Sequence, residues 1–222
     1  MNNKKTKTQV GIPSRILRRI KKLVKRPEEK WVYDTPDEYW ETRYSKGIHG
    51  GKSGPGSVGE NRTWKWSIID RFIDVKEADV LDIGCGDLSF WEGRTCKSYL
   101  GLDFSPTIIQ RNKLRNPEWK FIQGDASVNH NFQADIVFCF DMLFHIMSDD
   151  VYFDILRNLS KWTNKWLFIY TWHERYFNDE PTDGKYQYFR PLQKHLEYLS
   201  PLKLVTVEKH DEIGSMYVFS RE

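Results

Sequence analysis

Two short stretches place glycine and acidic residues where they could bind a nucleoside. In the first, the apolar run Val80–Ile83 contains Asp82 and is followed by Gly84-Cys85-Gly86. Such a run predicts a buried strand, and the glycines predict a tight loop whose backbone N–H groups can approach a ligand closely. A second apolar run ends in Asp103, a position from which a carboxylate can hydrogen-bond a ribose diol. The pair indicates an enzyme that uses a nucleoside-containing cofactor.

The glycine loop gives no clear match to a dinucleotide fingerprint, excludes a P-loop, and resembles a third kind of nucleotide site. After Gly86 come Asp87, Leu88 and Ser89, so the third glycine or alanine of a dinucleotide fingerprint has no clear match. No Gly-Lys-Ser/Thr follows, which excludes a P-loop. The string from Asp82 to Gly86 instead resembles motif I (D/E-x-G-x-G) of the class I S-adenosylmethionine-dependent methyltransferases.

Three further motifs extend this resemblance over roughly residues 60–220. Asp103 resembles the acid that holds the ribose in that family, Gln123-Gly124-Asp125-Ala126 resembles the adenine-binding end of its third strand, and 134–141 resembles its fourth strand. The resemblance implies S-adenosyl-L-methionine as cofactor. The residues we predict to bind it are Tyr44, Asp82, Gly84, Cys85, Gly86, Asp103, Phe104, Asp125, Ala126, Phe140 and Asp141.

The elements that must position these residues alternate along the chain. Strands are expected at 79–83, 98–102, 119–123, 135–140, 166–171, 202–208 and 213–219. Helices are expected from Trp64 onward and at 87–93, 105–114, 148–162 and 190–199. This order predicts an α/β fold with a doubly wound, seven-stranded, mostly parallel sheet. A short turn near Asp211 predicts an antiparallel C-terminal hairpin, and the resemblance implies the Rossmann-like methyltransferase version of the fold.

The chain is predicted to have three segments, 1–30, 31–63 and 64–222. Residues 1–30 contain eleven Lys or Arg and two Glu, a net charge of +9, so the other 192 residues carry −6 of the total of +3. Residues 14–26 predict a basic amphipathic helix that suits an anionic membrane surface, RNA or an acidic partner, or that docks on its own domain. Trp40, Tyr44 and the glycine-rich stretch 50–59, which we expect to be irregular, favour a lid over the cofactor.

Composition narrows the remaining possibilities. No apolar run approaches the ~20 residues of a membrane span, and no secretory signal is recognised. The three cysteines form no disulfide or zinc pattern, so we expect reduced thiols, no bound metal and a cytoplasmic location, with peripheral membrane contact left open through the tail.

The candidate catalytic residues are two histidines that follow the fourth and fifth strands. His145 and His173 could each act as the base that a hydroxyl nucleophile requires, and His49 is a weaker third candidate. His145 packing within the crossover, or His173 as a solvated loop residue, are the alternatives. Asp141 departs from the Asn/Asp-Pro-Pro-Tyr/Phe pattern of many amino methyltransferases.

A long loop after the fifth strand suggests the kind of acceptor. Residues 172–190 are rich in aromatic and acidic side chains, which suit a polyhydroxyl or amine-bearing ligand. We therefore predict O-methylation of a small-molecule or glycan-type hydroxyl. The alternatives are an RNA methyltransferase that grips phosphate through its tail, and a non-catalytic methyltransferase-like binding module.

Overall fold

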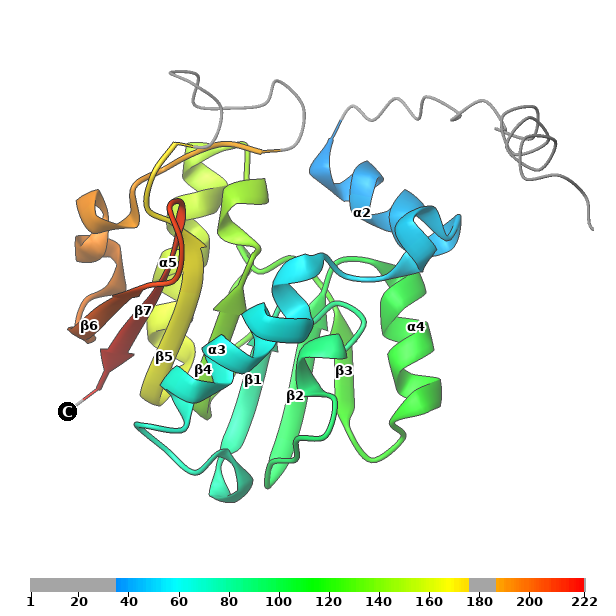
Figure 1. The fold of residues 1–222 in the computed structure, drawn as a ribbon, viewed down its shortest axis with the longest axis horizontal. Helices are drawn as coiled ribbons and strands as arrows, with labels where there is room; N and C mark the ends of the chain where they lie inside the picture. Colours follow the sequence, from blue (N-terminus) through cyan, green and yellow to red (C-terminus); the bar gives the residue numbers. More distant parts are fainter. Residues whose placement is uncertain (1–34, 176–186, 222) are drawn as a thin grey trace, which may run out of the picture. The chain divides into compact units, whose positions relative to one another are not determined.

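The computed structural model describes residues 35–175 and 187–221, all within one compact unit, Tyr33–Glu222 (Figure 1). The predicted tail helix at 14–26 and most of the loop 172–190 therefore lie outside the described residues. The division into three segments stays a prediction. No helix among the described residues is long and apolar enough to cross a membrane.

A seven-stranded sheet forms the centre of the fold, in the order β3-β2-β1-β4-β5-β7-β6. Neighbouring strands from β3 to β5 are parallel, and β6 and β7 form the predicted antiparallel hairpin. Strand β7 also pairs antiparallel with β5. The strands are β1 (Asp79–Ile83), β2 (Ser98–Asp103), β3 (Lys120–Gln123), β4 (Ala134–Phe140), β5 (Thr163–Trp172), β6 (Lys203–Lys209) and β7 (Gly214–Ser220).

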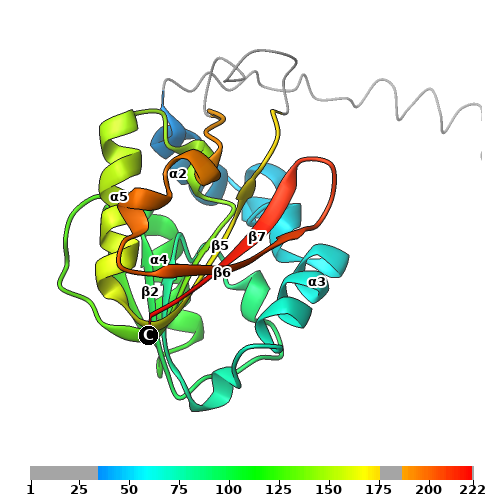
Figure 2. The ribbon, with the colours of Figure 1, turned by 90° about the vertical axis from the view of Figure 1, so that its left-hand side faces the viewer.

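Helices cover both faces of the sheet, and Figure 2 shows α3 and α5 on opposite sides of it. On one face, Trp66 of α3 and Ile108 of α4 pack with Phe138 and Phe168 of the sheet. On the other face, α5 packs with the alternate residues of the same strands, such as Val137. The helices are α2 (Pro36–Ser45), α3 (Gly59–Ile69), α4 (Pro106–Arg115) and α5 (Asp149–Trp162), and the 3₁₀ turns are η1 (Ile48–Gly51), η2 (Pro55–Ser57), η3 (Val75–Glu77), η4 (Ser89–Trp91), η5 (Leu143–His145), η6 (Leu192–Lys194) and η7 (Leu196–Leu199).

Two predicted helices are wrong. Across 87–93 only the short turn η4 forms, because Leu88 adopts a left-handed backbone with φ of 63° that no right-handed helix can continue through. The span 190–199 is two 3₁₀ turns separated at His195, whose φ is −133°. Their buried residues Leu192 and Leu199 still supply the apolar contacts that suggested a helix.

The glycine-rich stretch ends earlier than predicted. Helix α3 begins at Gly59 instead of near Trp64, so the predicted boundary at residue 63 falls inside a helix. Helix α3 ends at Ile69, so Phe72 lies in the turn that follows the helix. The glycines of 50–58 are not wholly irregular either, because η1 and η2 form there.

The segment from α2 to η2 is held over the carboxyl ends of β1 and β2. The Glu41 carboxylate accepts a hydrogen bond from the Ser105 hydroxyl at 2.5 Å and another from the Thr107 hydroxyl. Ser105 is the N-cap of α4, so this carboxylate lies near the positive end of that helix. Arg111 of α4 donates to two backbone carbonyls of the segment at 2.9 and 3.0 Å. Helix α2 is therefore placed to cover a ligand bound at these strand ends, as the lid prediction requires.

Candidate active site

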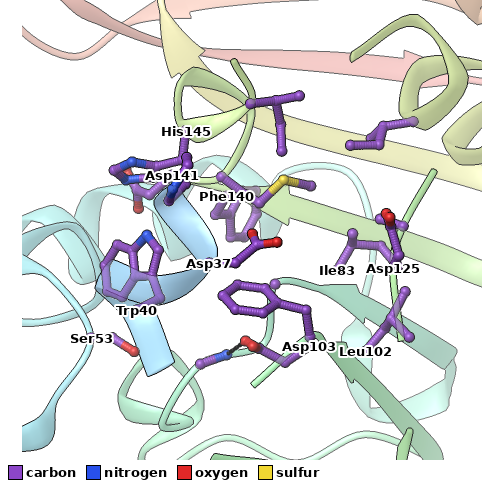
Figure 3. Close-up of a pocket in the computed structure, with 18 of the residues that line it drawn as sticks. Asp37, Trp40, Ser53, Ile83, Leu102, Asp103, Asp125, Phe140, Asp141 and His145 are labelled. Carbon is purple, nitrogen blue, oxygen red and sulfur yellow. Dashed lines mark hydrogen bonds between the residues drawn. The ribbon is translucent and has the colours of Figure 1, made fainter. Parts of the chain in front are cut away.

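A cavity of about 300 Å³ opens at the carboxyl ends of the parallel strands (Figure 3). Crevices at this edge are where open α/β sheets bind ligands. Ten of the thirteen residues predicted to bind the cofactor or to act in catalysis line it: Tyr44, Gly84, Gly86, Asp103, Phe104, Asp125, Ala126, Phe140, Asp141 and His145. The three that do not are Asp82, Cys85 and His173.

The loop after β1 requires glycine at two positions. Gly84 and Gly86 have φ values of 71° and 54°, which lie in the left-handed region. A Cβ on Gly86 would lie 3.2 Å from the Tyr44 hydroxyl and would clash with Ser53 Oγ. The loop is also fixed from behind, because Asn112 donates to the Gly86 carbonyl at 2.7 Å. The loop thus brings backbone to the cavity with no side chain between.

Asp103 is buried at the end of β2 and retains capacity to bind a diol. Its Oδ2 accepts the Gly86 N–H and its Oδ1 accepts the Ser105 N–H, both at 3.0 Å. Each carboxylate oxygen has two lone pairs, so each can accept one more hydrogen bond. Burial, with smaller contributions from the charges of Asp82 and Glu41, raises the pKa of Asp103 to about 6 against the lowering effect of these two N–H groups. The residues therefore fit a ribose whose two hydroxyls donate to the two oxygens.

Asp82 and Cys85 require a correction, because their side chains are turned away from the cavity. Asp82 Oδ2 accepts hydrogen bonds from Trp91 Nε1 and the Tyr99 hydroxyl, both at 2.8 Å. Burial raises the pKa of Asp82 to about 6, although these two bonds oppose the rise. Cys85 is buried and its backbone N–H donates to the Leu102 carbonyl at 3.1 Å. Their roles are thus to hold the loop, and the sequence motif gave no signal of this difference.

Asp125 and Ala126 follow β3 and line the cavity as predicted. Asp125 Oδ1 accepts the Ser127 N–H at 2.8 Å, which fixes the carboxylate at the turn. Asp37 of α2 also lines this cavity. Partial burial, followed by the charge of Asp125, raises the pKa of Asp37. The two acids therefore make the cavity electronegative where a donor such as an amino group would be favoured.

A different set of residues surrounds the opposite side of the cavity. Figure 3 shows His145, Asp141 and Trp40 on one side, and Ile83, Leu102 and Asp125 on the other. His145 is buried in η5 after β4, and its ring meets Trp40 edge-on with centroids 5.2 Å apart. Helix α2 and the β4 exit thus meet at His145, which places an imidazole at the cavity wall.

The other two candidate histidines lie outside the cavity wall. His173 follows β5, where its N–H donates to the Ile213 carbonyl at 2.7 Å and its Nδ1 lies 3.0 Å from Ser215 Oγ. His49 is exposed in η1. We therefore no longer propose either as the base, because neither shares the cavity with the predicted cofactor residues.

Sequence reasoning placed Trp40 and the stretch 50–59 in a lid over the cofactor, but of the covering segment it named only Tyr44 as a site residue. Asp37, Trp40, Ser53 and Ser57 line the cavity although they come long before motif I in the chain. The aromatic residues beside the glycines suggested a lid, but nothing in the spacing identified Asp37. Apolar residues of β4, η5 and α5 complete the wall: Met142, Ile146, Val151 and Ile155.

Comparison with known proteins identifies the kind of domain that contains this cavity. Residues 80–165 match the family model described as a methyltransferase domain, and the matched span runs from β1 to the start of β5. The chain contains a methyltransferase domain. S-adenosylmethionine is the cofactor of this methyltransferase, and the buried Asp103 carboxylate and the glycine loop fit it. The alternative of a non-catalytic module loses its support. No curated protein was similar enough in sequence to count as a match.

Solved structures share the fold of the methyltransferase at low sequence identity. The N-methyltransferase NodS from Bradyrhizobium japonicum, in complex with S-adenosylhomocysteine, has a TM-score of 0.61 at 13% identity, over 82% of this chain and 98% of that one. Magnesium protoporphyrin IX methyltransferase from Synechocystis, also with S-adenosylhomocysteine, has a TM-score of 0.60 at 14% identity, over 84% and 98%. A TehB-like methyltransferase from Corynebacterium glutamicum has 0.56 at 18%, over 84% and 98%.

The described part of the chain contains no group of side chains that could form a metal site. No cluster of three or more His, Cys, Asp or Glu residues there could hold a metal ion.

Proposed function

We propose that the methyltransferase transfers its methyl group to the hydroxyl of a small-molecule or glycan-type acceptor. The observation that carries this proposal is the location of His145, an imidazole on the wall of the same cavity as the predicted cofactor residues. A hydroxyl is a weak nucleophile that needs a nearby base, and neutral imidazole serves this purpose near neutral pH.

The chemistry requires alignment and one proton transfer. When bound, S-adenosylmethionine supplies a methyl group whose carbon–sulfur bond breaks as the acceptor oxygen bonds to carbon, with the electron pair left on sulfur. Asp103 and the loop at Gly84 and Gly86 hold the nucleoside, which leaves the wall near His145 for the acceptor. His145 receives the hydroxyl proton and later releases it to water. Trp40, in contact with His145, orients its ring.

The proposal is tested by methyl transfer from labelled S-adenosylmethionine. Fractionated lysate is incubated with the protein, and the labelled product is identified by mass spectrometry. We expect label in a low-molecular-mass or glycan fraction, as an ether that resists alkali. Label confined to nitrogen, RNA or protein would refute it.

Two variants test the base. His145→Asn is expected to lower kcat about 100-fold, the usual contribution of a general base, while affinity for S-adenosylhomocysteine changes little. His195→Asn is the matched control, because His195 lies between η6 and η7 and does not line the cavity. Equal kcat values for the two variants would remove His145 from the reaction.

The basic tail supports an RNA acceptor as the second candidate. Residues 1–30 carry a net charge of +9, which favours contact with phosphates. If RNA is the acceptor, its affinity should fall steeply with salt and should be lost when residues 1–30 are removed. RNA binding that survives the truncation would exclude the tail as the binding element.

A further inference from the structure

A buried lysine lies directly behind the cavity wall. The side chain of Lys65, on α3, is 1% exposed and forms an ion pair with Asp141 Oδ2. Its Nζ also donates to the Gly56 carbonyl at 3.1 Å and lies 4.0 Å from the centre of the Tyr170 ring. Lys65 itself does not line the cavity, whereas Asp141 does. Lys65 can therefore influence a bound ligand only through Asp141 or through its charge.

The position of Asp141 is fixed by three independent features. Its backbone has a φ of 56°, a left-handed conformation that is unfavourable for a residue other than glycine. Its N–H donates to the Tyr170 carbonyl at 3.1 Å. A Cβ at Gly56 would lie 2.7 Å from Asp141 Cγ and 2.8 Å from Oδ1, so only glycine leaves room for the carboxylate.

Fold stability does not account for this arrangement. Burying a lysine costs desolvation energy that its ion pair roughly repays, so such a pair is weak evidence of stabilisation. Among the ion pairs of the described residues, Lys65 is the most buried cation. The carboxylate that it holds is 28% exposed and opens into the cavity. Unfavourable features that converge on one cavity carboxylate indicate a functional constraint.

The sheet order shows which end of the cofactor this carboxylate borders. Of the predicted ribose and adenine acids, Asp103 is the last residue of β2 and Asp125 follows β3, and both strands lie on one side of β1. Asp141 follows β4, on the other side of β1. A nucleoside held by Asp103 and Asp125 would occupy the β2–β3 side of the cavity, so the rest of the cofactor would have to lie on the side that Asp141 lines. Figure 3 likewise shows Asp141 beside His145, across the cavity from Asp125.

We propose that the Lys65–Asp141 pair borders the transferable methyl group and forms the polar wall of the acceptor subsite. Asp141 accepts a hydrogen bond from a donor group of the acceptor, and Lys65 is a positioning residue that holds and charge-balances it. This rests on the proposed function and moves Asp141 from the cofactor contacts to the acceptor contacts. The described cavity wall contains the carboxylates of Asp37, Asp103, Asp125 and Asp141, and this excess of negative charge favours a neutral or cationic hydroxyl compound over a phosphate or carboxylate.

The test uses the cofactor's own charge as the probe. S-adenosylmethionine has a positive sulfonium where S-adenosylhomocysteine has a neutral sulfur, so the ratio of their Kd values reports the local charge. Asp141→Asn leaves the positive charge of Lys65 without its partner carboxylate, and it should weaken the binding of S-adenosylmethionine relative to that of S-adenosylhomocysteine by about tenfold. Lys65→Met leaves Asp141 uncompensated and should shift the ratio about tenfold the other way. The double variant should return the ratio close to that of the wild type.

Calorimetry on the full chain measures both ligands with each variant. Asp154→Asn is the control, because it removes a carboxylate from an exposed ion pair on α5 and should leave the ratio unchanged. If Lys65→Met fails to fold, Asp141→Asn decides alone. A ratio unchanged by Asp141→Asn would overturn the proposal.

A second arm separates this inference from the proposed function. With the acceptor found by labelling, Asp141→Asn should raise the acceptor KM at least fivefold, while Lys65→Arg, which keeps the charge, should retain most of the activity. An unchanged acceptor KM would refute the acceptor contact. If the ratio shifts as expected but the labelled product is not a hydroxyl compound, the location beside the methyl group stands and the hydroxyl acceptor fails.

Discussion

Asp103 should make cofactor binding depend on pH. Its two oxygens each accept one backbone N–H, and the ribose hydroxyls need the lone pairs that remain. Protonation would turn one oxygen into a donor and remove an acceptor. Because burial raises the pKa of Asp103 to about 6, this protonation falls within an accessible range. The ionised form binds, so affinity should be full above the pKa and should decline as the pH falls through it.

The size of the effect follows from that pKa. If only the ionised form binds, the apparent Kd rises by the inverse of the ionised fraction. With a pKa of about 6, roughly one molecule in ten is ionised at pH 5, so S-adenosylhomocysteine should bind about tenfold more weakly there than at pH 7.5. A carboxylate with an ordinary pKa near ~3.9 would give almost no change over the same range.

Calorimetric titration with S-adenosylhomocysteine at pH 7.5, 6 and 5 measures the effect. Asp103→Asn is the matched control: it should bind more weakly at pH 7.5 and lose the pH dependence. A flat Kd in the wild type would refute the raised pKa. The same pH dependence in Asp103→Asn would assign the titration to another group.

Three further substitutions test the loop and the covering helix. Asp82→Ala should lower the free energy of unfolding, measured in urea, by about 2–4 kcal/mol, because Trp91 Nε1 and the Tyr99 hydroxyl lose their buried acceptor. Asp82→Asn should lower it by less. A loss below about 1 kcal/mol for Asp82→Ala would contradict this. Glu41→Gln should raise the dissociation rate of S-adenosylhomocysteine about fivefold or more, because it weakens two charge-assisted hydrogen bonds that hold α2 to α4. Stopped-flow tryptophan fluorescence measures this rate. An unchanged rate would show that α2 does not control release of the ligand. Gly86→Ala should weaken the binding of S-adenosylhomocysteine at least tenfold, as measured by calorimetry, because the backbone at residue 86 is left-handed. An affinity equal to that of the wild type would show that the loop adapts.

Most of the residues predicted to hold the nucleoside do line the cavity, because each part of the predicted pattern is local. A strand followed by a glycine loop, and acids at strand ends, are patterns within a few residues, and parallel strands bring their carboxyl ends to one edge. Asp103 and Asp125 were therefore placed correctly without coordinates. Asp82 was misplaced because alternation in a strand fixes its burial but not which partners it meets, here Trp91 and Tyr99.

The covering segment and the acceptor side could not be predicted in the same way. Asp37 and Asp141 are 104 positions apart, and Lys65 pairs with Asp141 across 76. No local pattern marks such a pairing, since a lysine in an amphipathic helix ordinarily faces solvent.

By itself, the sequence predicted the fold class and the strand ends expected to face the nucleoside, since hydrophobic periodicity and turn chemistry act over short stretches of chain, and its resemblance to a known family implied the cofactor. The tertiary structure alone decided that Asp82 faces inward, that His145 rather than His173 reaches the cavity, and that Lys65 holds Asp141 there. These outcomes depend on packing between distant segments, where the direction of each side chain is set by neighbours that the local sequence does not contain.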